Sequence, residues 1–345
     1  MRKIGIMTWY YGANYGALAQ SIALYNAIKN QGYDCAFVNY KPKKYIKTLR
    51  YANLPKRREL YRVDRVIDGL RKIKNLSTTR YFTVTKPVKS VAGINGLGLD
   101  KIVFGSDAIF NIKHPMCESL FYGVGITCKK VTYSPSCEYL DPEYVLPNEY
   151  KKSLCEMEKI SVRDVNTYNL VEKNTGIKPQ ITLDPTFLYD FAGIGEDVCQ
   201  DKYLLMYSFS AWNVYGSQIS TYAKKNGLKI VCLGQRVKWA DISIENATFE
   251  QWIGAFRKAN IVMTDSFHGT VFSIKNGKQI ILCGRKDKRA KIDSLLKQVG
   301  ITLDVFEGEK VEQYLEKNTI DYAEKQPVID REIEESREYL VDALR

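Results

Sequence analysis

The chain has only two histidines. One of them, His268, comes shortly after an apolar stretch that predicts a strand. Residues 261–264 predict that buried strand, and Asp265, Ser266 and Gly269 surround the histidine just before a helical run. An imidazole titrates near neutral pH and can move a proton, and the start of a helix favours an anion. The pattern therefore predicts a ligand site, although a histidine that caps the helix or fills a polar gap in the core would have the same pattern.

Polar residues also follow two other predicted strands. Asp107 comes after the apolar run Lys-Ile-Val-Phe, and Arg163 comes after Ile-Ser-Val. A carboxylate in this position can orient or deprotonate a hydroxyl group, and a guanidinium can hold a phosphate or carboxylate through two parallel hydrogen bonds. Each residue could instead cap a helix or form an ion pair. The other histidine, His114, precedes a proline in a predicted loop and carries a weaker signal.

A glycine-flanked turn, residues 12–16, separates the first predicted strand from the first predicted helix. Glycines let backbone amides approach a ligand, so Asn14 and Tyr15 are candidates for contact with an acceptor; an ordinary strand-to-helix turn is the alternative. The turn matches neither G-x-G-x-x-G nor the phosphate-binding loop of nucleotide hydrolases, and neither motif occurs elsewhere. The sequence therefore argues against a nicotinamide cofactor and against nucleotide hydrolysis by a P-loop.

A run of cations follows the strand predicted at residues 279–284. Arg285 and Arg289 would lie close to His268 and could form a phosphate-binding rim, while a solvated helix face explains the other cations. Together with the histidine and the carboxylates, these residues suit an anionic donor and proton transfer to or from a hydroxyl-bearing acceptor. Ser266 and Gly269 are expected to bind the donor, and Asp265 is expected at the acceptor or in the cleft. No metal-binding constellation is evident, and no cofactor is expected.

Strand and helix patterns alternate along almost the whole chain, which predicts parallel sheets with right-handed crossovers. Strands are expected at 3–9, 35–40, 101–107, 130–136, 160–164, 202–210, 229–234, 261–265 and 279–284, and helices at 17–32, 148–159, 165–176, 248–260, 286–300 and 330–345. A capping box, Thr248 with Gln251, opens one of these helices.

The predicted fold class is α/β, with two Rossmann-like domains that face each other across a cleft. The N-terminal domain is expected over residues 1–190, with a basic helical excursion at about 41–75. The C-terminal domain is expected over 200–325. A last helix at 326–345 is expected to pack back on the N-terminal domain.

The net charge of +12 is concentrated in one segment. Residues 41–74 contain thirteen Lys and Arg against three acidic residues, a net charge of +10, interleaved with Tyr, Leu and Ile. Such a segment forms either a solvated helical excursion or a surface for an anionic membrane; no nucleic-acid-binding signature accompanies it.

The chain has no apolar run of membrane-spanning length and no signal peptide, so we expect a cytoplasmic protein, in contact with the inner face of the membrane if the segment binds there. Its eight cysteines contain no C-x-x-C pair, which argues against disulfides and zinc.

Five ordered stretches resemble the polysaccharide pyruvyl transferase family over roughly residues 10 to 300. The block Thr-Asp-Ser-Phe-His-Gly around His268 is the most specific of them. The stretches are NYGALAQSIALYNAIKNQGYD, VFGSDAIFN, ISVRDVNTYNLVEKNTG, ITLDPTFL and IVMTDSFHGTVFSI.

The resemblance implies a fold like that of GT-B glycosyltransferases. It also implies transfer of a pyruvyl group from phosphoenolpyruvate to two hydroxyls of a sugar or lipid-linked oligosaccharide, which gives a cyclic ketal and phosphate. The donor site would then fall on Arg163 and His268, with Asp107 near the acceptor.

This chain departs from the family pattern at one position. Many members have Arg-Leu-His where this chain has Ser266, Phe267 and His268, so an arginine that could hold the donor is missing; Arg285 or Arg289 could replace it. Two alternatives stay open, a glycosyltransferase of the same fold that uses a nucleotide sugar, and a glycan-binding relative without turnover. Tryptophans 212, 239 and 252 are candidates for stacking on a sugar.

Overall fold

The computed structural model describes residues 2–12, 14–41, 46–47, 66–67, 69–70, 74, 79–141, 143–284 and 289–345. They form two compact units: unit 1 comprises residues 1–189 with 331–345, and unit 2 comprises residues 190–330. Most of the basic segment predicted at 41–75 lies outside the described residues, and so does Arg285.

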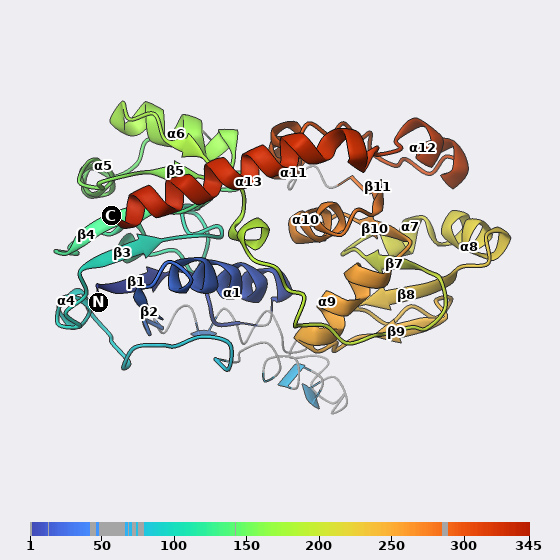
Figure 1. Cartoon of the computed structure of the whole chain (residues 1–345), viewed down its shortest axis with the longest axis horizontal. Helices are drawn as coiled ribbons and strands as arrows, with labels where there is room; N and C mark the ends of the chain where they lie inside the picture. The colour runs from blue at the N-terminus through green and yellow to red at the C-terminus, as the bar shows by residue number, and fades with distance from the viewer. Residues whose placement is uncertain are drawn as a thin grey trace. The chain divides into compact units, whose positions relative to one another are not determined.

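Unit 1 is built on a parallel sheet in the order β2-β1-β3-β4. A bridge between Val131 and Lys159 continues the ladder from β4 toward a short parallel pair, β5 and β6. Figure 1 shows β1, β3 and β4 side by side, with helix α1 along them. The strands of this unit are β1 (Lys3–Met7), β2 (Asp34–Phe37), β3 (Lys101–Phe104), β4 (Lys129–Thr132), β5 (Ser161–Val162) and β6 (Gln180–Ile181).

Helix α1 (Tyr15–Lys29) is apolar on nearly every face and is buried along most of its length, which identifies it as a core helix of unit 1. Its N-cap is Asn14, whose side chain accepts a hydrogen bond from the amide of Ala17 at 3.2 Å. The remaining helices are α4 (Val91–Asn95), α5 (Asn148–Cys155), α6 (Val165–Thr175) and the 3-10 helices η2 (Ser119–Tyr122) and η3 (Pro185–Leu188).

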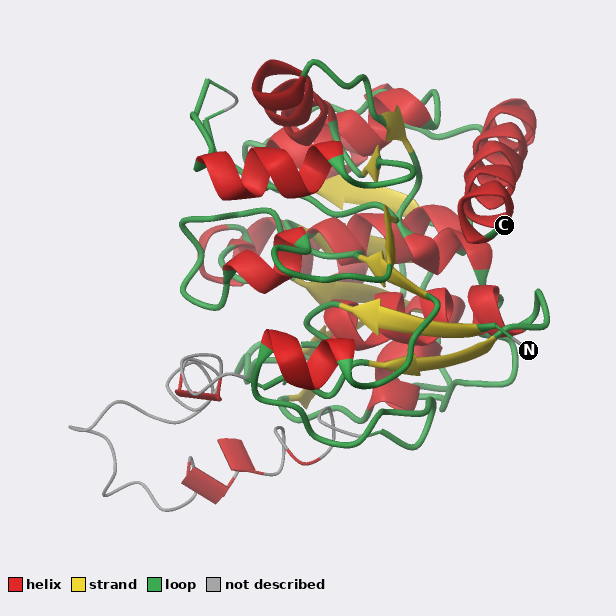
Figure 2. Cartoon of the chain, turned by 90° about the vertical axis from the view of Figure 1, so that its left-hand side faces the viewer, coloured by secondary structure: helices red, strands yellow, loops and turns green. Residues whose placement is uncertain are grey.

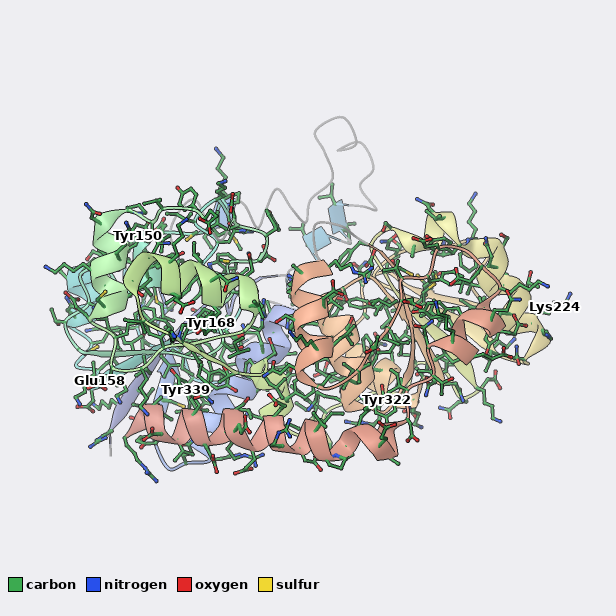
Figure 3. The ribbon with its side chains drawn as sticks, turned by 90° about the horizontal axis from the view of Figure 1, so that it is seen from above. Tyr150, Glu158, Tyr168, Lys224, Tyr322 and Tyr339 are labelled. Carbon is green, nitrogen blue, oxygen red and sulfur yellow. The ribbon has the colours of Figure 1, made fainter. Side chains whose placement is uncertain are left out.

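The end of the chain completes the core of unit 1. Helix α13 (Tyr322–Leu344) contributes residues from Arg331 onward to this unit. Tyr339 points from α13 toward the sheet (Figure 3), and its hydroxyl donates to the carbonyl of Thr132 at 3.0 Å. Ser336 accepts a hydrogen bond from the amide of Leu183 at 2.9 Å. These buried contacts attach the last helix to strands far away in the sequence.

Unit 2 contains a five-stranded parallel sheet in the order β11-β10-β7-β8-β9. As in unit 1, which faces the viewer in Figure 2, strands alternate with helices along the chain. The strands are β7 (Tyr203–Tyr207), β8 (Lys229–Leu233), β9 (Ile242–Ile244), β10 (Ile261–Thr264) and β11 (Gln279–Leu282). The helices are α7 (Ala211–Val214), α8 (Gly216–Lys225), α9 (Phe249–Lys258), α10 (Phe267–Lys275), α11 (Arg289–Gln298) and α12 (Val311–Lys317).

Local sequence signals account for several of these boundaries. The capping box predicted at Thr248 and Gln251 is confirmed, with both of its reciprocal hydrogen bonds present at the start of α9. Other predictions were wrong in extent. The strand predicted at 160–164 contains only two residues, and β9 was not predicted because it is a short, half-exposed edge strand.

Each sheet has one point at which the strand order reverses. In unit 1 this point lies between β1 and β3, and in unit 2 it lies between β7 and β10. In open parallel sheets, ligands bind beyond the carboxyl ends of the strands that flank such a point. The residues that follow these four strands are therefore where a functional site is expected.

Candidate functional site

His268 lies at the switch point of unit 2. It is the second residue of α10, directly after the carboxyl end of β10, and its side chain is half-buried. The ring of Phe267 contacts its imidazole edge-on, with 5.2 Å between the centroids. The location combines a titratable imidazole with the amide groups of a helix N-terminus, an arrangement suited to an anion that must be protonated.

Ser266 and Gly269 build the turn that presents this histidine. The hydroxyl of Ser266 caps α10 by accepting from the amide of Gly269 at 2.9 Å, and it lies 3.2 Å from the hydroxyl of Thr264. A Cβ at position 269 would lie 2.1 Å from Thr264 Oγ1, so only glycine fits without displacing β10 from the helix. Both residues therefore position His268, whereas the sequence had placed them at the donor.

Asp265 is fully buried and organises the loop that follows β7. Its carboxylate accepts from the amides of Phe209 and Ser210 at 2.9 and 3.1 Å and from the hydroxyl of Ser210 at 2.9 Å. These bonds join the ends of β7 and β10 at the switch point. The geometry favours a positioning role over the contact with an acceptor that the sequence had indicated.

A cation from α11 lies beside this turn. The Lys291 amine lies 5.8 Å from the centre of the Phe267 ring, next to His268. Arg289, which the sequence favoured, forms an ion pair with Asp293 one helical turn along, at 3.0 Å. Its position next to His268 makes Lys291 a further candidate for attracting an anionic donor. The sequence singled it out only as one member of a basic run.

At the switch point of unit 1, Asn14 and Tyr15 start helix α1. Asn14 is exposed, but its side-chain oxygen is engaged as the helix cap. Tyr15 is buried, and burial raises the pKa of its hydroxyl well above the ordinary value. The predicted contact with an acceptor thus fits Asn14 better than Tyr15.

Asp107 lies in the loop after β3, half-buried, with a left-handed backbone conformation (φ 72°). This loop is packed tightly: a Cβ at Gly105 would lie 2.1 Å from the carbonyl oxygen of Tyr133, and the hydroxyl of Thr8 donates to the carbonyl of Ser106 at 2.8 Å. Asp107 Oδ1 accepts from the amide of Ala108 at 2.7 Å, which fixes the carboxylate. The residue is thus held rigidly at the switch-point edge.

Arg163 is placed differently from the sequence prediction, because its side chain is only 2% exposed. The guanidinium forms an ion pair with Asp184 at 3.0 Å. Burial by itself lowers the pKa of Arg163, but the carboxylates of Asp184, Asp107 and Asp164 raise it overall. A cation surrounded by three carboxylates is poorly suited to holding an anionic donor, so we assign Arg163 to positioning the strand ends, including Asp107.

The Val-Arg-Asp and Leu-Asp-Pro-Thr stretches form one supporting network around this pair. Asp164 caps α6 and accepts from the hydroxyl of Ser136 at 2.6 Å, and Asp184 caps η3. These motifs therefore build the frame of unit 1, within which Asp107 and Arg163 lie close to each other.

The structure adds His114 and Glu138 to the candidates. Both carboxylates, Glu138 and Asp107, act electrostatically on the His114 imidazole. The scarcity of histidine was the only sequence signal for His114. Nothing in the sequence indicated Glu138, which follows a different strand.

Of the three candidate tryptophans, Trp252 is fully buried in an aromatic core with Phe256 and Phe272, so it cannot stack on a sugar. Trp239 lies against Gly216 and lines a hollow of about 440 Å³ in unit 2. The side chain of Trp212 lies outside the described residues.

Among the described residues, no group of three or more His, Cys, Asp or Glu could hold a metal ion. Within the same part of the chain, no helix has both the length and the apolar character needed to cross a membrane.

Solved structures similar to this chain include UDP-N-acetylglucosamine 2-epimerases, at low sequence identity. UDP-GlcNAc 2-epimerase from Neisseria meningitidis, bound to UDP-GlcNAc, has a TM-score of 0.54 at 9% identity, and the match covers 100% of this chain and 99% of the epimerase chain. MnaA from S. aureus, in a structure with UDP, has a TM-score of 0.53 at 10% identity, and the match covers 100% of this chain and 96% of the MnaA chain. The epimerase from Rickettsia bellii has a TM-score of 0.52 at 9% identity, with the same coverage as MnaA. A search of curated protein sequences finds no match.

The parallel sheets of the two units and these likenesses define a GT-B-like α/β fold. A model of the polysaccharide pyruvyl transferase family matches residues 14–287, which is well over half of the chain. The chain therefore belongs to the polysaccharide pyruvyl transferase family and is a transferase of polysaccharide biosynthesis. The cleft between its two domains stays a prediction.

Proposed function

We propose that this protein transfers the pyruvyl group of phosphoenolpyruvate to two hydroxyls of one sugar in a surface polysaccharide or its lipid-linked precursor, without a cofactor. The observation that carries the proposal is the position of His268, within the family-matched region, at the N-terminus of α10 and at the switch point of unit 2. That is where a parallel sheet binds an anion and where a proton donor is needed.

The residues suit the chemistry of the donor. Phosphoenolpyruvate carries a carboxylate and a phosphate, which the amides of the α10 N-terminus and the amine of Lys291 can attract. The imidazole of His268 delivers a proton to the methylene carbon, which becomes a methyl group. The positive charge that develops on the adjacent carbon is then open to attack by a hydroxyl oxygen.

The protons and bonds balance over the complete reaction. Two carbon–oxygen bonds form, one to each sugar hydroxyl, and the bond between that carbon and the phosphate oxygen breaks. Of the two hydroxyl protons, one replaces the proton that His268 gave to the methyl group, and the other leaves with the phosphate. Asp107, held rigidly on unit 1, is the carboxylate that we assign to accepting a hydroxyl proton.

The test is phosphate release from phosphoenolpyruvate by the purified chain, with a panel of free and lipid-linked glycans. We expect phosphate release that depends on one class of glycan, and a product whose mass corresponds to a pyruvate ketal. Release of a nucleoside diphosphate from a nucleotide sugar, without any phosphate from phosphoenolpyruvate, would instead identify a glycosyltransferase. Glycan binding without either reaction would indicate a relative that has lost turnover.

A further inference from the structure

A cluster of polar and aromatic side chains lies where the chain leaves β1, β3 and β4 of unit 1. Trp9 follows β1, Asp107 and His114 follow β3, and Glu138 follows β4. Asn111 Nδ2 donates to Glu138 Oε2 at 3.3 Å, and its carbonyl accepts from the amide of His114 at 2.8 Å. The loop that carries His114 is therefore tied directly to Glu138.

The imidazole of His114 is held on two sides. Its ring packs against Trp9 with 4.5 Å between the centroids and 36° between the planes. The amide of Met116 donates to His114 Nδ1 at 3.2 Å. Because Nδ1 is an acceptor, a neutral imidazole carries its proton on Nε2 and presents a hydrogen-bond donor in a fixed direction.

The surroundings favour this neutral form. Burial lowers the pKa of His114, and the Glu138 and Asp107 carboxylates only partly oppose the shift. Protonation would also place a second N–H against the amide of Met116. Other charged groups of the same loop are engaged elsewhere, because Lys113 lies over the Tyr144 ring and Glu118 accepts from the hydroxyl of Tyr40.

The backbone around the cluster is strained. Asp107, Ser134 and Glu138 have φ of 72°, 53° and 55°, and they are the non-glycine residues with positive φ in the described part of the chain. Such residues gather at ligand sites. Trp9 adds a buried indole N–H that has no hydrogen-bond partner among the described residues. Together these features indicate a surface built for a ligand.

We infer that His114, Glu138 and Asp107 form the subsite that binds the acceptor sugar through its hydroxyl groups. His114 donates from Nε2 to a sugar oxygen, and the two carboxylates accept hydrogen bonds from hydroxyls. Tyr139, the residue that follows Glu138, is 59% exposed and is a candidate for stacking on the sugar. The inference rests on the proposed function for the identity of the reaction, and for the role of Asp107 near the acceptor. What it adds is sugar recognition by His114 and Glu138, which the family motifs do not include.

The presence of only two histidines makes a direct test possible. Side-chain NMR of the histidines, assigned with a His114→Gln variant, should show His114 as the neutral Nε2–H tautomer at pH 7. Methyl galactoside, methyl glucoside and methyl mannoside serve as probes. We expect at least one of them to shift the His114 resonances and to leave those of His268 in place. If none of the three moves the His114 resonances, the subsite does not exist.

Variants separate recognition from structure. His114→Phe keeps an aromatic ring against Trp9 but removes the donor, so it should raise the KM for the acceptor by about tenfold and leave the KM for phosphoenolpyruvate unchanged. His114→Gln restores a donor and should recover part of the loss. A His114→Phe protein that unfolds more easily, yet keeps the acceptor KM of the parent, would show a purely structural histidine. Glu138→Gln provides an independent variant. It should raise the KM for the acceptor and leave the KM for phosphoenolpyruvate unchanged.

The two proposals fail in different ways. If no glycan elicits phosphate release, pyruvyl transfer is wrong, while a glycoside-dependent shift of His114 would still support a sugar subsite. If the parent protein releases phosphate and His114→Phe keeps the parent's KM for the acceptor, only the subsite is wrong.

Discussion

At the scale of single residues, the proposed chemistry depends most directly on His268. It is half-buried at the start of α10, where the imidazole can reach a ligand at the helix N-terminus. We expect His268→Ala to lower turnover by about 10²-fold or more, the scale of general acid catalysis, without loss of fold. Phosphate release and an unfolding curve measured on the same preparation check this. Near-parental turnover in a folded variant would leave His268 with a structural role only.

Lys291 and Arg289 offer a matched pair on one helix. Lys291 lies beside Phe267, whereas Arg289 is paired with Asp293. Lys291→Gln should raise the KM for phosphoenolpyruvate by about tenfold, because a cation next to the donor phosphate is lost. Arg289→Gln should leave that KM near the parental value. Equal effects of the two changes would mean that the charge of the helix, and not the position of Lys291, attracts the donor.

A substitution of Arg163 should affect the stability of the protein more than its catalysis. Removing one partner of a buried ion pair leaves an uncompensated charge, here the carboxylate of Asp184. Arg163→Leu should therefore lower the free energy of unfolding by about 3–5 kcal/mol. Urea unfolding measures the loss. If the Arg163→Leu protein is stable and has a raised KM for phosphoenolpyruvate, the result would support the direct contact with the donor that the sequence predicted.

At the scale of elements, the junction of β10 with α10 determines where His268 lies. Gly269→Ala would force a Cβ to within 2.1 Å of Thr264 Oγ1, so the helix must shift from the strand. We expect a loss of about 1–3 kcal/mol in unfolding free energy. Ser266→Ala removes only the cap and should cost about 1 kcal/mol.

The same pair of variants tests the positioning role. A displaced helix should lower turnover in Gly269→Ala more than the missing cap does in Ser266→Ala, measured by phosphate release at saturating phosphoenolpyruvate. If Gly269→Ala has parental turnover and stability, the tight contact with β10 does not position the histidine.

At the scale of the whole molecule, the charge of the chain is uneven. Residues 41–74, most of them outside the described part of the structure, carry a net charge of +10. We expect this segment to bind anionic membranes, because each Lys or Arg near such a surface contributes about 1 kcal/mol. Binding should weaken steeply as salt screens the charges.

Co-sedimentation with anionic and neutral liposomes, at low and physiological salt, measures this attachment. Changing Lys56, Arg57 and Arg58 to Gln should reduce binding to the anionic liposomes, while activity on a soluble acceptor persists. A protein that stays in the supernatant with anionic liposomes at low salt has no such attachment, and the segment would then be a solvated excursion.

The sequence by itself determined those features that depend on residues close together in the chain. The alternation of apolar strands and helices indicated the α/β class, and the capping box located the start of α9. His268 could be placed at a strand end because β10, the turn and α10 are contiguous. Hydrophobic periodicity and capping are local signals, so a single sequence carries them.

The tertiary structure alone decided which strand ends are neighbours and which side chains they bury. Arg163 had the pattern of a ligand-binding cation, but Asp184 and Asp164 surround it in the core, where its charge is neutralised by carboxylates. Glu138 meets His114 only because β3 and β4 pair in parallel and their loops continue the ladder. The order of strands in a sheet depends on long-range packing, and no local pattern in the sequence encodes that order.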